Sequence, residues 1–398
     1  MAHAKNRRFI FRANAIKFML MQKIISNQNV KVTIFFLVSV LFLYVWMWGI
    51  RQVFPAQPPG QIEALYKGVA LETNAWLEPW QRWDTPHYQA IAEHGYSAFD
   101  SALFTPPLYP LLIRLFSPLF NGNTLASGLF ISGLAFWGFL IVLFHLASLE
   151  FQNEKDVWRI ILYVSFFPTA FFFIAAYNES LFLWMVLLSF YSVRKKQWIW
   201  AGVFGGLAAF TRIAGALMII PLTFAAWEAW KTGEKRGILS PVFAGLGITM
   251  YPLYVCWILN LPPTAILDAL NKRGGETTFP GLNLIEAFKR ITQGILWEEN
   301  LTELSFSVFF LMLTIFVWKK LPRIYGIYSA ALLFLFLTRF GSPQPLVGMA
   351  RYGIEIFPAF FILGIWGRNA WANRIILYLF WLGWLFFSAQ FAIWGWVG

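Results

Sequence analysis

Charged residues are scarce in this chain. They make up 13% of its 398 residues, against about 25% in a typical soluble domain, while hydrophobic residues reach 59%. Aromatic residues alone account for 20%, with 43 phenylalanines and 21 tryptophans. A water-soluble globule of this size has too little interior for so many rings, because much of its surface must face water. The composition therefore excludes a soluble protein and predicts an integral membrane protein.

Cysteine and histidine are also rare, which restricts the kinds of site that can be expected. The single cysteine, Cys256, lies inside an apolar run, so the sequence predicts neither a disulfide nor a cysteine metal cluster. The four histidines are scattered along the chain. His87, Glu93 and His94 could imitate a metal site, but they do not follow the H-E-x-x-H order. We therefore expect no metal ligands and no cofactor.

The apolar residues form long runs without strict alternation, which excludes a β-barrel and predicts an all-α polytopic membrane protein. The run 103–120 contains four prolines and one arginine, and we expect it to be a broken interfacial helix that does not cross the membrane. About 11 other segments are expected to be transmembrane helices: 32–50, 125–148, 159–176, 179–193, 198–211, 213–230, 238–260, 304–318, 324–338, 352–367 and 374–396.

Acidic residues are absent from residues 1–31, which carry seven basic residues. Basic segments mark the cytoplasmic side, so we expect a cytoplasmic N-terminal segment over 1–31 and a single multispanning domain over 32–398. The loops 51–124 and 261–303 and the C-terminus then lie outside. We attribute the net charge of +12 mainly to basic residues on the cytoplasmic side, and we expect no nucleic-acid partner. A cleaved signal peptide is the alternative for the first span, but no small-residue cleavage site follows it.

The densest polar segment, 80–96, lies in the first outer loop. Asp84 precedes Pro86 in this segment and is suited to cap a helix that begins there. Alternatively, its carboxylate, held at the membrane surface between tryptophans, is suited to act as a general base on a hydroxyl group. The residue types leave both interpretations open.

A few other charged residues stand at the outer ends of apolar spans. Glu179 lies at a depth where charge is costly and usually functional, although Asn178 followed by an acid is also a normal helix start. Arg212 interrupts two apolar runs, where it could reach lipid headgroups or bind a phosphate in a bidentate manner. Arg351 lies in a later outer segment. An acid for a hydroxyl beside cations for an anionic headgroup is what transfer from a lipid phosphate requires.

Five short motifs are spread over residues 80–360. They are Arg82-Trp83-Asp84 with Tyr88, Ile91-Ala92 and Gly95-Tyr96; Pro106-Pro107-Leu108-Tyr109-Pro110; Tyr177-Asn178-Glu179-Ser180; Thr211-Arg212; and Arg351-Tyr352. Together they resemble the PIG-V-like mannosyltransferases, which belong to the multispanning glycosyltransferases of the GT-C fold and take a sugar from a polyprenyl phosphate. Each motif alone is weak, but the five follow in the family's order with matching topology.

The resemblance implies metal-independent, inverting transfer of a hexose, with mannose as the family's sugar, at the extracytoplasmic face. Asp84 would be the general base. Arg212 and Arg351 would hold the donor phosphate, and Glu179 would orient hydroxyl groups. His87 and the loop 261–303 have no clear counterpart in the family. Further substrate-binding residues are expected at Arg82, Trp83, His87, Tyr88, Tyr177, Asn178 and Tyr352.

The implied partners are a polyprenyl-phosphate sugar, a glycan, glycolipid or protein acceptor, and membrane lipid. The membrane would be the plasma membrane of a prokaryote or the endoplasmic reticulum of a eukaryote. A transporter or lipid flippase is the alternative, although the sequence shows no internal repeat of the kind that transporters usually contain. A non-catalytic assembly subunit is a third class, and it predicts that Asp84→Asn is tolerated.

Overall fold

The computed structural model describes residues 2–58, 65–341, 344–346, 348–395 and 397, with side chains from residue 28 onward. Within this part of the chain, regular structure is almost entirely helical, which confirms the all-α prediction. The exception is a two-stranded antiparallel sheet in which β1 (Glu276–Thr277) pairs with β2 (Arg339–Phe340).

The α-helices follow one another along the chain as α1 (Ala2–Val53), α3 (Thr85–His94), α4 (Leu108–Phe116), α5 (Thr124–Glu150), α6 (Glu154–Ser165), α7 (Glu179–Arg194), α8 (Trp198–Thr211), α9 (Ile219–Lys231), α10 (Leu239–Trp257), α11 (Thr264–Gly274), α12 (Leu282–Thr292), α13 (Trp297–Lys320), α14 (Arg323–Leu337), α15 (Met349–Tyr352), α16 (Pro358–Trp366) and α17 (Ala370–Ala392). Short 3₁₀ helices separate them: η1 (Glu78–Trp80), η2 (Gly95–Ser97), η3 (Ala102–Phe104), η4 (Ser117–Phe120), η5 (Ala170–Phe173), η6 (Ile213–Met218), η7 (Lys235–Ile238) and η8 (Gly353–Glu355).

The chain is a multi-pass integral membrane protein, but the expected count of 11 long spans is not confirmed. Within the described residues, 6 helices are long and apolar enough to cross a membrane, or 7 if the bent pair Met349–Glu355 and Pro358–Trp366 forms one span. Several expected spans are short helices instead. The run 159–176, for example, is divided between α6 and η5 by a turn that contains Pro168. Proline has no backbone N–H and its ring clashes with the preceding turn, which favours a break at this position.

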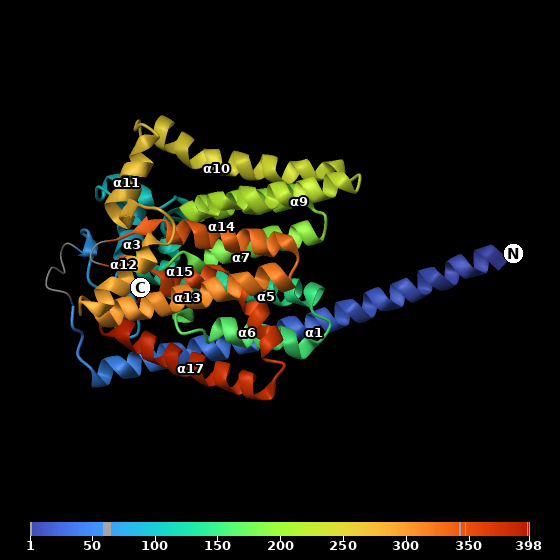
Figure 1. Cartoon of the computed structure of the whole chain (residues 1–398), viewed down its shortest axis with the longest axis horizontal. Coiled ribbons are helices and arrows are strands. Elements are labelled where there is room, and N and C mark those ends of the chain that lie inside the picture. The colour runs from blue at the N-terminus through green and yellow to red at the C-terminus, as the bar shows by residue number, and fades with distance from the viewer. Residues whose placement is uncertain (1, 59–64, 342–343, 347, 396, 398) are drawn as a thin grey trace.

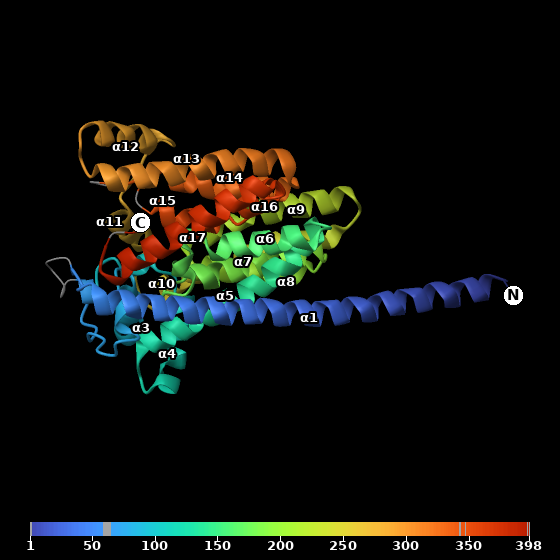
Figure 2. The same ribbon diagram turned by 90° about the horizontal axis from the view of Figure 1, so that it is seen from below.

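The helices of the loops 51–124 and 261–303 gather at one end of the bundle. Figures 1 and 2 show α3, α11, α12 and the C-terminus at this end, while the N-terminal part of α1 projects beyond the other. We call it the loop end. Helix α1 is continuous from Ala2 to Val53 and passes through the end of the basic segment 1–31. Helix α4, expected within 103–120, has 9 residues, about 14 Å, which is too short to span a bilayer of roughly 30 Å.

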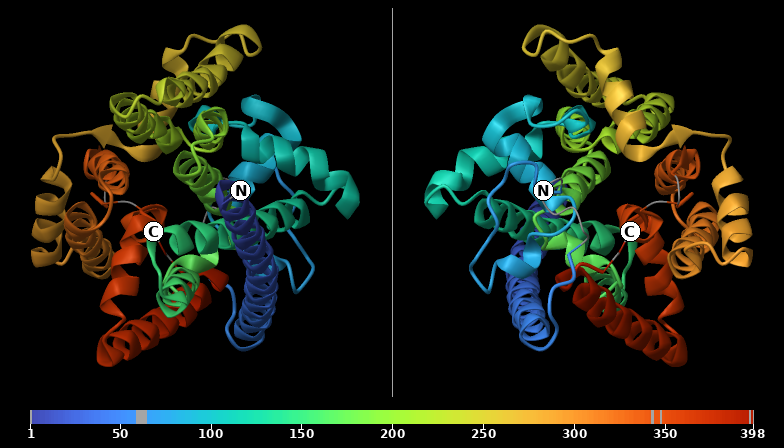
Figure 3. Two further views of the ribbon diagram at one scale, coloured as in Figure 1. Left: turned by 90° about the vertical axis from the view of Figure 1, so that its right-hand side faces the viewer. Right: turned by 90° about the vertical axis from the view of Figure 1, so that its left-hand side faces the viewer.

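Small residues bring the central helices close together. Helix α8 packs against α7 and α10, and a Cβ atom added at Gly247 of α10 would lie 2.3 Å from the Cα atom of Gly206 in α8. Only glycine fits such an approach of two backbones, as is common between membrane helices. Viewed along the bundle, α1 lies beside α17 at one edge and α9 lies beside α10 at another (Figure 3).

Candidate active site at the loop end of the bundle

Asp84 occupies the position before the first turn of α3, but its side chain does not cap that helix. The carboxylate is 22% exposed and accepts hydrogen bonds from two arginines, Arg351 (2.6 Å between Nη1 and Oδ2) and Arg273. Trp83, the preceding residue, has φ of 50°, a left-handed conformation that is rare for a bulky residue. The chain therefore adopts a strained turn that presents the carboxylate to the bundle, as happens at many functional sites.

Glu179 binds Arg351 and a third arginine, Arg212. Its side chain is 0% exposed, and its Oε1 atom accepts from Arg351 Nε at 2.5 Å and from Arg212 Nη1 at 2.7 Å. A second fully buried carboxylate, Glu355 of η8, lies 2.9 Å from Arg212 Nη2. Three carboxylates and three guanidiniums thus form one continuous cluster, which we call the Asp84 cluster: Asp84, Glu179, Glu355, Arg212, Arg273 and Arg351.

Helix α15, which carries Arg351, is fixed by two buried polar contacts. Glu303 of α13 accepts a hydrogen bond from the Ala350 amide at 2.9 Å, and Thr169 Oγ1 donates to the Ala350 carbonyl at 2.7 Å. The guanidinium of Arg351 also lies over the ring of Tyr177, 4.6 Å from its centroid. The position of Arg351 is therefore determined by α13 and by the segment 169–177, both distant from it in sequence.

Polar and aromatic neighbours complete the cluster. Asn178 directly precedes α7, yet its side chain makes no capping bond and instead accepts from Arg212 Nη1 at 2.6 Å and from Tyr88 Oη at 3.1 Å. Tyr177 Oη accepts from the Asp84 amide at 3.0 Å, and the ring of Tyr352 lies against the Arg212 guanidinium. Both residues that could have been simple helix caps, Asp84 and Asn178, therefore direct their side chains to the cluster.

Two of the expected substrate-binding residues lie apart from it. Arg82 is 1% exposed and donates to Glu78 Oε1 at 2.5 Å and to the Ala392 carbonyl at 3.0 Å. The indole N–H of Trp83 donates to the Gly395 carbonyl at 3.3 Å. Both side chains thus face the C-terminal segment and join the loop 51–124 to the end of α17 and the residues after it.

Two members of the cluster were not among the expected site residues, Arg273 and Glu355. Arg273 lies at the end of α11, in the loop 261–303, and only the fold places it over Asp84. Glu355 follows Arg351 by four residues in an apolar segment, so an acid one helical turn from an expected arginine was the signal for it.

The charges around Asp84 and His87 set the protonation of both groups. Burial by itself raises the pKa of Asp84, but the guanidiniums of Arg273 and Arg351 outweigh burial and hold that pKa well below its usual range. Burial, followed by the guanidinium of Arg273, lowers the pKa of His87 to about 3. His87 Nε2 lies 2.5 Å from Arg273 Nη1, and because a guanidinium only donates, this nitrogen accepts. At neutral pH, Asp84 is ionised and His87 is neutral.

The three residues considered for a metal site do not gather in one place: Glu93 and His94 are close, with 3.7 Å between Oε2 and Nε2, but His87 contacts Arg273 instead. Glu93 Oε1 accepts a hydrogen bond from the Thr124 hydroxyl at 2.5 Å, while His94 is half exposed. In the part of the chain that the structure describes, no group of three or more histidine, cysteine, aspartate or glutamate side chains is placed to hold a metal ion.

Comparison with known proteins identifies a structural neighbour. No protein-family model and no curated protein sequence matches the chain. Among solved structures, it is similar to ArnT from Cupriavidus metallidurans bound to undecaprenyl phosphate, with a TM-score of 0.51 and 13% sequence identity over 86% of this chain. The chain spans 63% of the length of that ArnT chain. The likeness supports the GT-C fold expected from the sequence, whereas membership of the PIG-V-like family is not confirmed.

Proposed function

We propose that this protein is a membrane glycosyltransferase that moves a hexose from a polyprenyl-phosphate sugar to a hydroxyl acceptor. The observation that carries the proposal is the Asp84 cluster, in which an ionised, partly exposed carboxylate lies beside guanidiniums at the loop end of the bundle. The structural neighbour ArnT binds undecaprenyl phosphate, which is a lipid of the proposed class. Mannose remains the sugar favoured by the sequence resemblance.

In the proposed reaction, Asp84 takes the proton of the acceptor hydroxyl. The acceptor oxygen forms a bond to the anomeric carbon as the bond from that carbon to the phosphate oxygen breaks. An attack opposite the leaving group inverts the configuration. The leaving phosphate gains negative charge, which Arg351 and Arg212 are placed to stabilise without a metal ion. Glu179 keeps both arginines in place, because it accepts from each of them.

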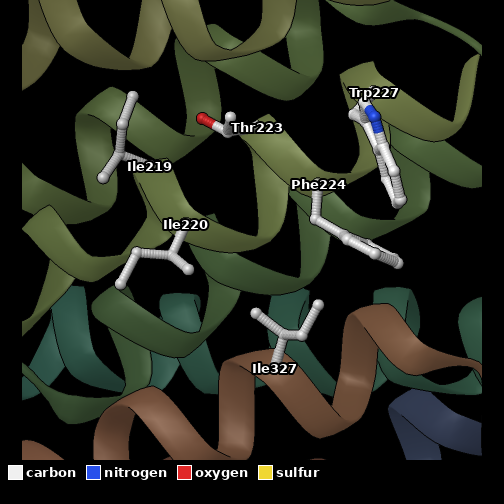
Figure 4. Close-up of a pocket in the computed structure, with 6 residues that line it drawn as sticks. All are labelled: Ile219, Ile220, Thr223, Phe224, Trp227 and Ile327. Atoms are coloured by element: carbon white, nitrogen blue, oxygen red, sulfur yellow. The ribbon is translucent and has the colours of Figure 1, made fainter. Parts of the chain in front are cut away.

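An apolar groove lies along α9, the helix that follows Arg212 and η6 in the chain, and is suited to the lipid tail of the donor. Arg212 leads through η6 directly into α9, whose side chains line most of an open groove of about 630 Å³. Figure 4 shows these side chains with Ile327 of α14 opposite them. A lipid whose phosphate lies near Arg212 could therefore lay its chain along α9. The groove is lined by Ile219, Ile220, Thr223, Phe224, Trp227 and Ile327.

The proposal places the site on the extracytoplasmic side, with the N-terminus in the cytoplasm. A reporter fused after Ala56 should then be active outside the membrane, and a reporter fused after Gln197 should be active inside. The opposite pattern would exclude extracytoplasmic transfer.

The activity itself can be tested with purified protein in detergent. Radiolabelled polyprenyl-phosphate hexose is supplied with a pool of glycan, glycolipid and protein acceptors, with and without EDTA. We expect transfer in both conditions. Transfer that requires a restored divalent metal would contradict the metal-independent mechanism, and movement of the lipid across vesicles without transfer would favour the flippase alternative.

A further inference from the structure

Arg273 differs from the other arginines of the Asp84 cluster in exposure and in origin. Its side chain is 29% exposed, whereas those of Arg212 and Arg351 are 12% and 7% exposed. It belongs to α11, a short helix at the loop end that packs on η3, outside the candidate membrane spans. Arg273 is therefore the cationic member of the cluster that solvent reaches most readily.

The partners of Arg273 differ as well. Arg212 and Arg351 both bind the fully buried Glu179, which holds them in the bundle. Among the residues that the structure describes, Arg273 contacts the carboxylate of Asp84 and the Nε2 atom of the buried His87. The proposed base therefore has one of its oxygens covered by a guanidinium that buried carboxylates do not hold.

These contacts set up a competition between Asp84 and a phosphate for the same guanidinium. In the structure as it stands, Arg273 binds one carboxylate oxygen of Asp84 and Arg351 binds the other, so an acceptor hydroxyl would share its oxygen with a guanidinium, whose charge makes the carboxylate a weaker base. A phosphate oxygen binds a guanidinium in the same geometry as a carboxylate oxygen does. A donor phosphate that binds Arg273 would thus free Oδ1 of Asp84 for the acceptor hydroxyl.

We propose that Arg273 binds the donor phosphate and that this binding releases Asp84, so that the base becomes available only when the donor is present. This inference rests on the proposed function. After the sugar leaves, the lipid phosphate carries one more negative charge than in the donor, so the contact with Arg273 becomes stronger as the reaction proceeds. An interaction that strengthens in this way favours the transition state over the bound donor.

The first test measures binding of polyprenyl phosphate, the reaction product, to the purified full-length protein. We expect Arg273→Ala to weaken binding by about 10-fold to 100-fold, which is the loss expected for a charge-assisted hydrogen bond. Lys272→Ala is the matched control, because Lys272 carries the same charge on the same helix but is 60% exposed and faces Asp100. Unchanged binding in Arg273→Ala, or an equal loss in both variants, would overturn the inference.

The second test examines the competition directly. Because Asp84→Asn removes the charge that competes for Arg273, it should tighten polyprenyl-phosphate binding, and this gain should shrink when Arg273→Ala is also present. Equal gains in both backgrounds would overturn the inference. Arg273→Lys keeps the charge and should restore part of the affinity, which separates a local role from a folding defect. If the unaltered protein neither binds polyprenyl phosphate nor transfers sugar, the proposed function itself fails.

Discussion

Buried carboxylates at the two ends of the helix bundle differ in how exposed their arginine partners are. At the end opposite the loops, Asp156 is 1% exposed, but its partners Arg159 and Arg368 are 21% and 57% exposed. At the loop end, Glu179 is 0% exposed and its partners Arg351 and Arg212 are only 7% and 12% exposed. An arginine left partly in water loses little hydration, whereas burying both charges of a pair costs several kcal/mol per ion.

This difference indicates that the ion pairs at the loop end are retained for function and not for stability. The pairs around Asp156 join neighbouring helix ends and need no explanation beyond folding. The Asp84 cluster holds Glu179, Glu355, Arg212 and Arg351 almost completely away from water, although hydrophobic residues of similar size are often at least as stabilising in such positions. A costly arrangement of this kind is expected where an anionic substrate must be bound.

The largest effect should come from removing the proposed base. Asp84→Asn should reduce sugar transfer by about 10²-fold to 10⁴-fold, the usual contribution of a general base, with the fold retained. Asp156→Asn at the opposite end is the matched variant, and it should lower stability by about 1–3 kcal/mol and leave transfer by the folded protein unchanged. The radiolabel assay and thermal unfolding of both variants measure this contrast. Normal transfer by Asp84→Asn would instead favour an assembly subunit.

The second largest effect should come from changing Glu179, at the centre of the Asp84 cluster, and it should appear in the free energy of unfolding. Glu179→Gln leaves Arg351 and Arg212 without their shared carboxylate, and loss of one partner from a buried pair typically costs about 3–5 kcal/mol. Glu150→Gln is the control at the other end, where the partner Arg194 is 40% exposed, and it should cost less. Unfolding of the two purified variants checks the order. Equal losses would remove the distinction between the two ends.

The pH dependence of stability should report the buried, neutral His87. Its pKa is about 3 in the folded protein and about 6.5 when unfolded, so the unfolded chain takes up the proton first as the pH falls. The stability that depends on a neutral His87 is present above pH 6.5 and is lost as the pH falls toward 3. Relative to His87→Gln, the unaltered protein should lose about 2 kcal/mol between pH 7 and pH 5. Parallel pH profiles from unfolding experiments would contradict this assignment.

The smallest effect should come from removing a single neutral hydrogen bond beside the Asp84 cluster. Tyr88→Phe removes the hydroxyl that donates to Asn178 Oδ1 at 3.1 Å, while Arg212 continues to bind the same oxygen at 2.6 Å. Because the acceptor stays satisfied, we expect a loss of about 1 kcal/mol in unfolding and little change in donor affinity. A loss of activity comparable to that of Asp84→Asn would show that Tyr88 participates more directly in the reaction.

Much of the site could be located from the sequence because charge is rare outside the basic, expected cytoplasmic segments. Asp84, Glu179, Arg212 and Arg351 stood out for this reason, and the structure brings all four together. Arg273 could not be found in the same way, because it is one of several basic residues in a polar loop. Arg82 stood in the motif beside Asp84, but the turn at Trp83 directs its side chain to the opposite side. Neighbours in sequence share a site only if the backbone turns them the same way.

The number of long spans was also only partly predictable from the sequence. Apolar runs are readily recognised, but hydropathy does not reveal that a buried run such as 159–176 breaks at Pro168 and continues as a 3₁₀ turn. Inside the bundle, neighbouring helices can supply hydrogen-bond partners for the backbone groups that a helix break leaves free, whereas lipid cannot.

The sequence by itself determined that this protein lives in a membrane, that it is helical, and that a few charges lie where lipid would exclude them. These properties follow from the transfer of side chains and backbone groups out of water, which depends mainly on composition and on the order of residues. The tertiary structure alone decided that the two possible caps, Asp84 and Asn178, turn inward and that α11 places Arg273 over the proposed base. The contact between Asp84 and Arg273 joins residues 189 positions apart, and only packing brings them within hydrogen-bond distance.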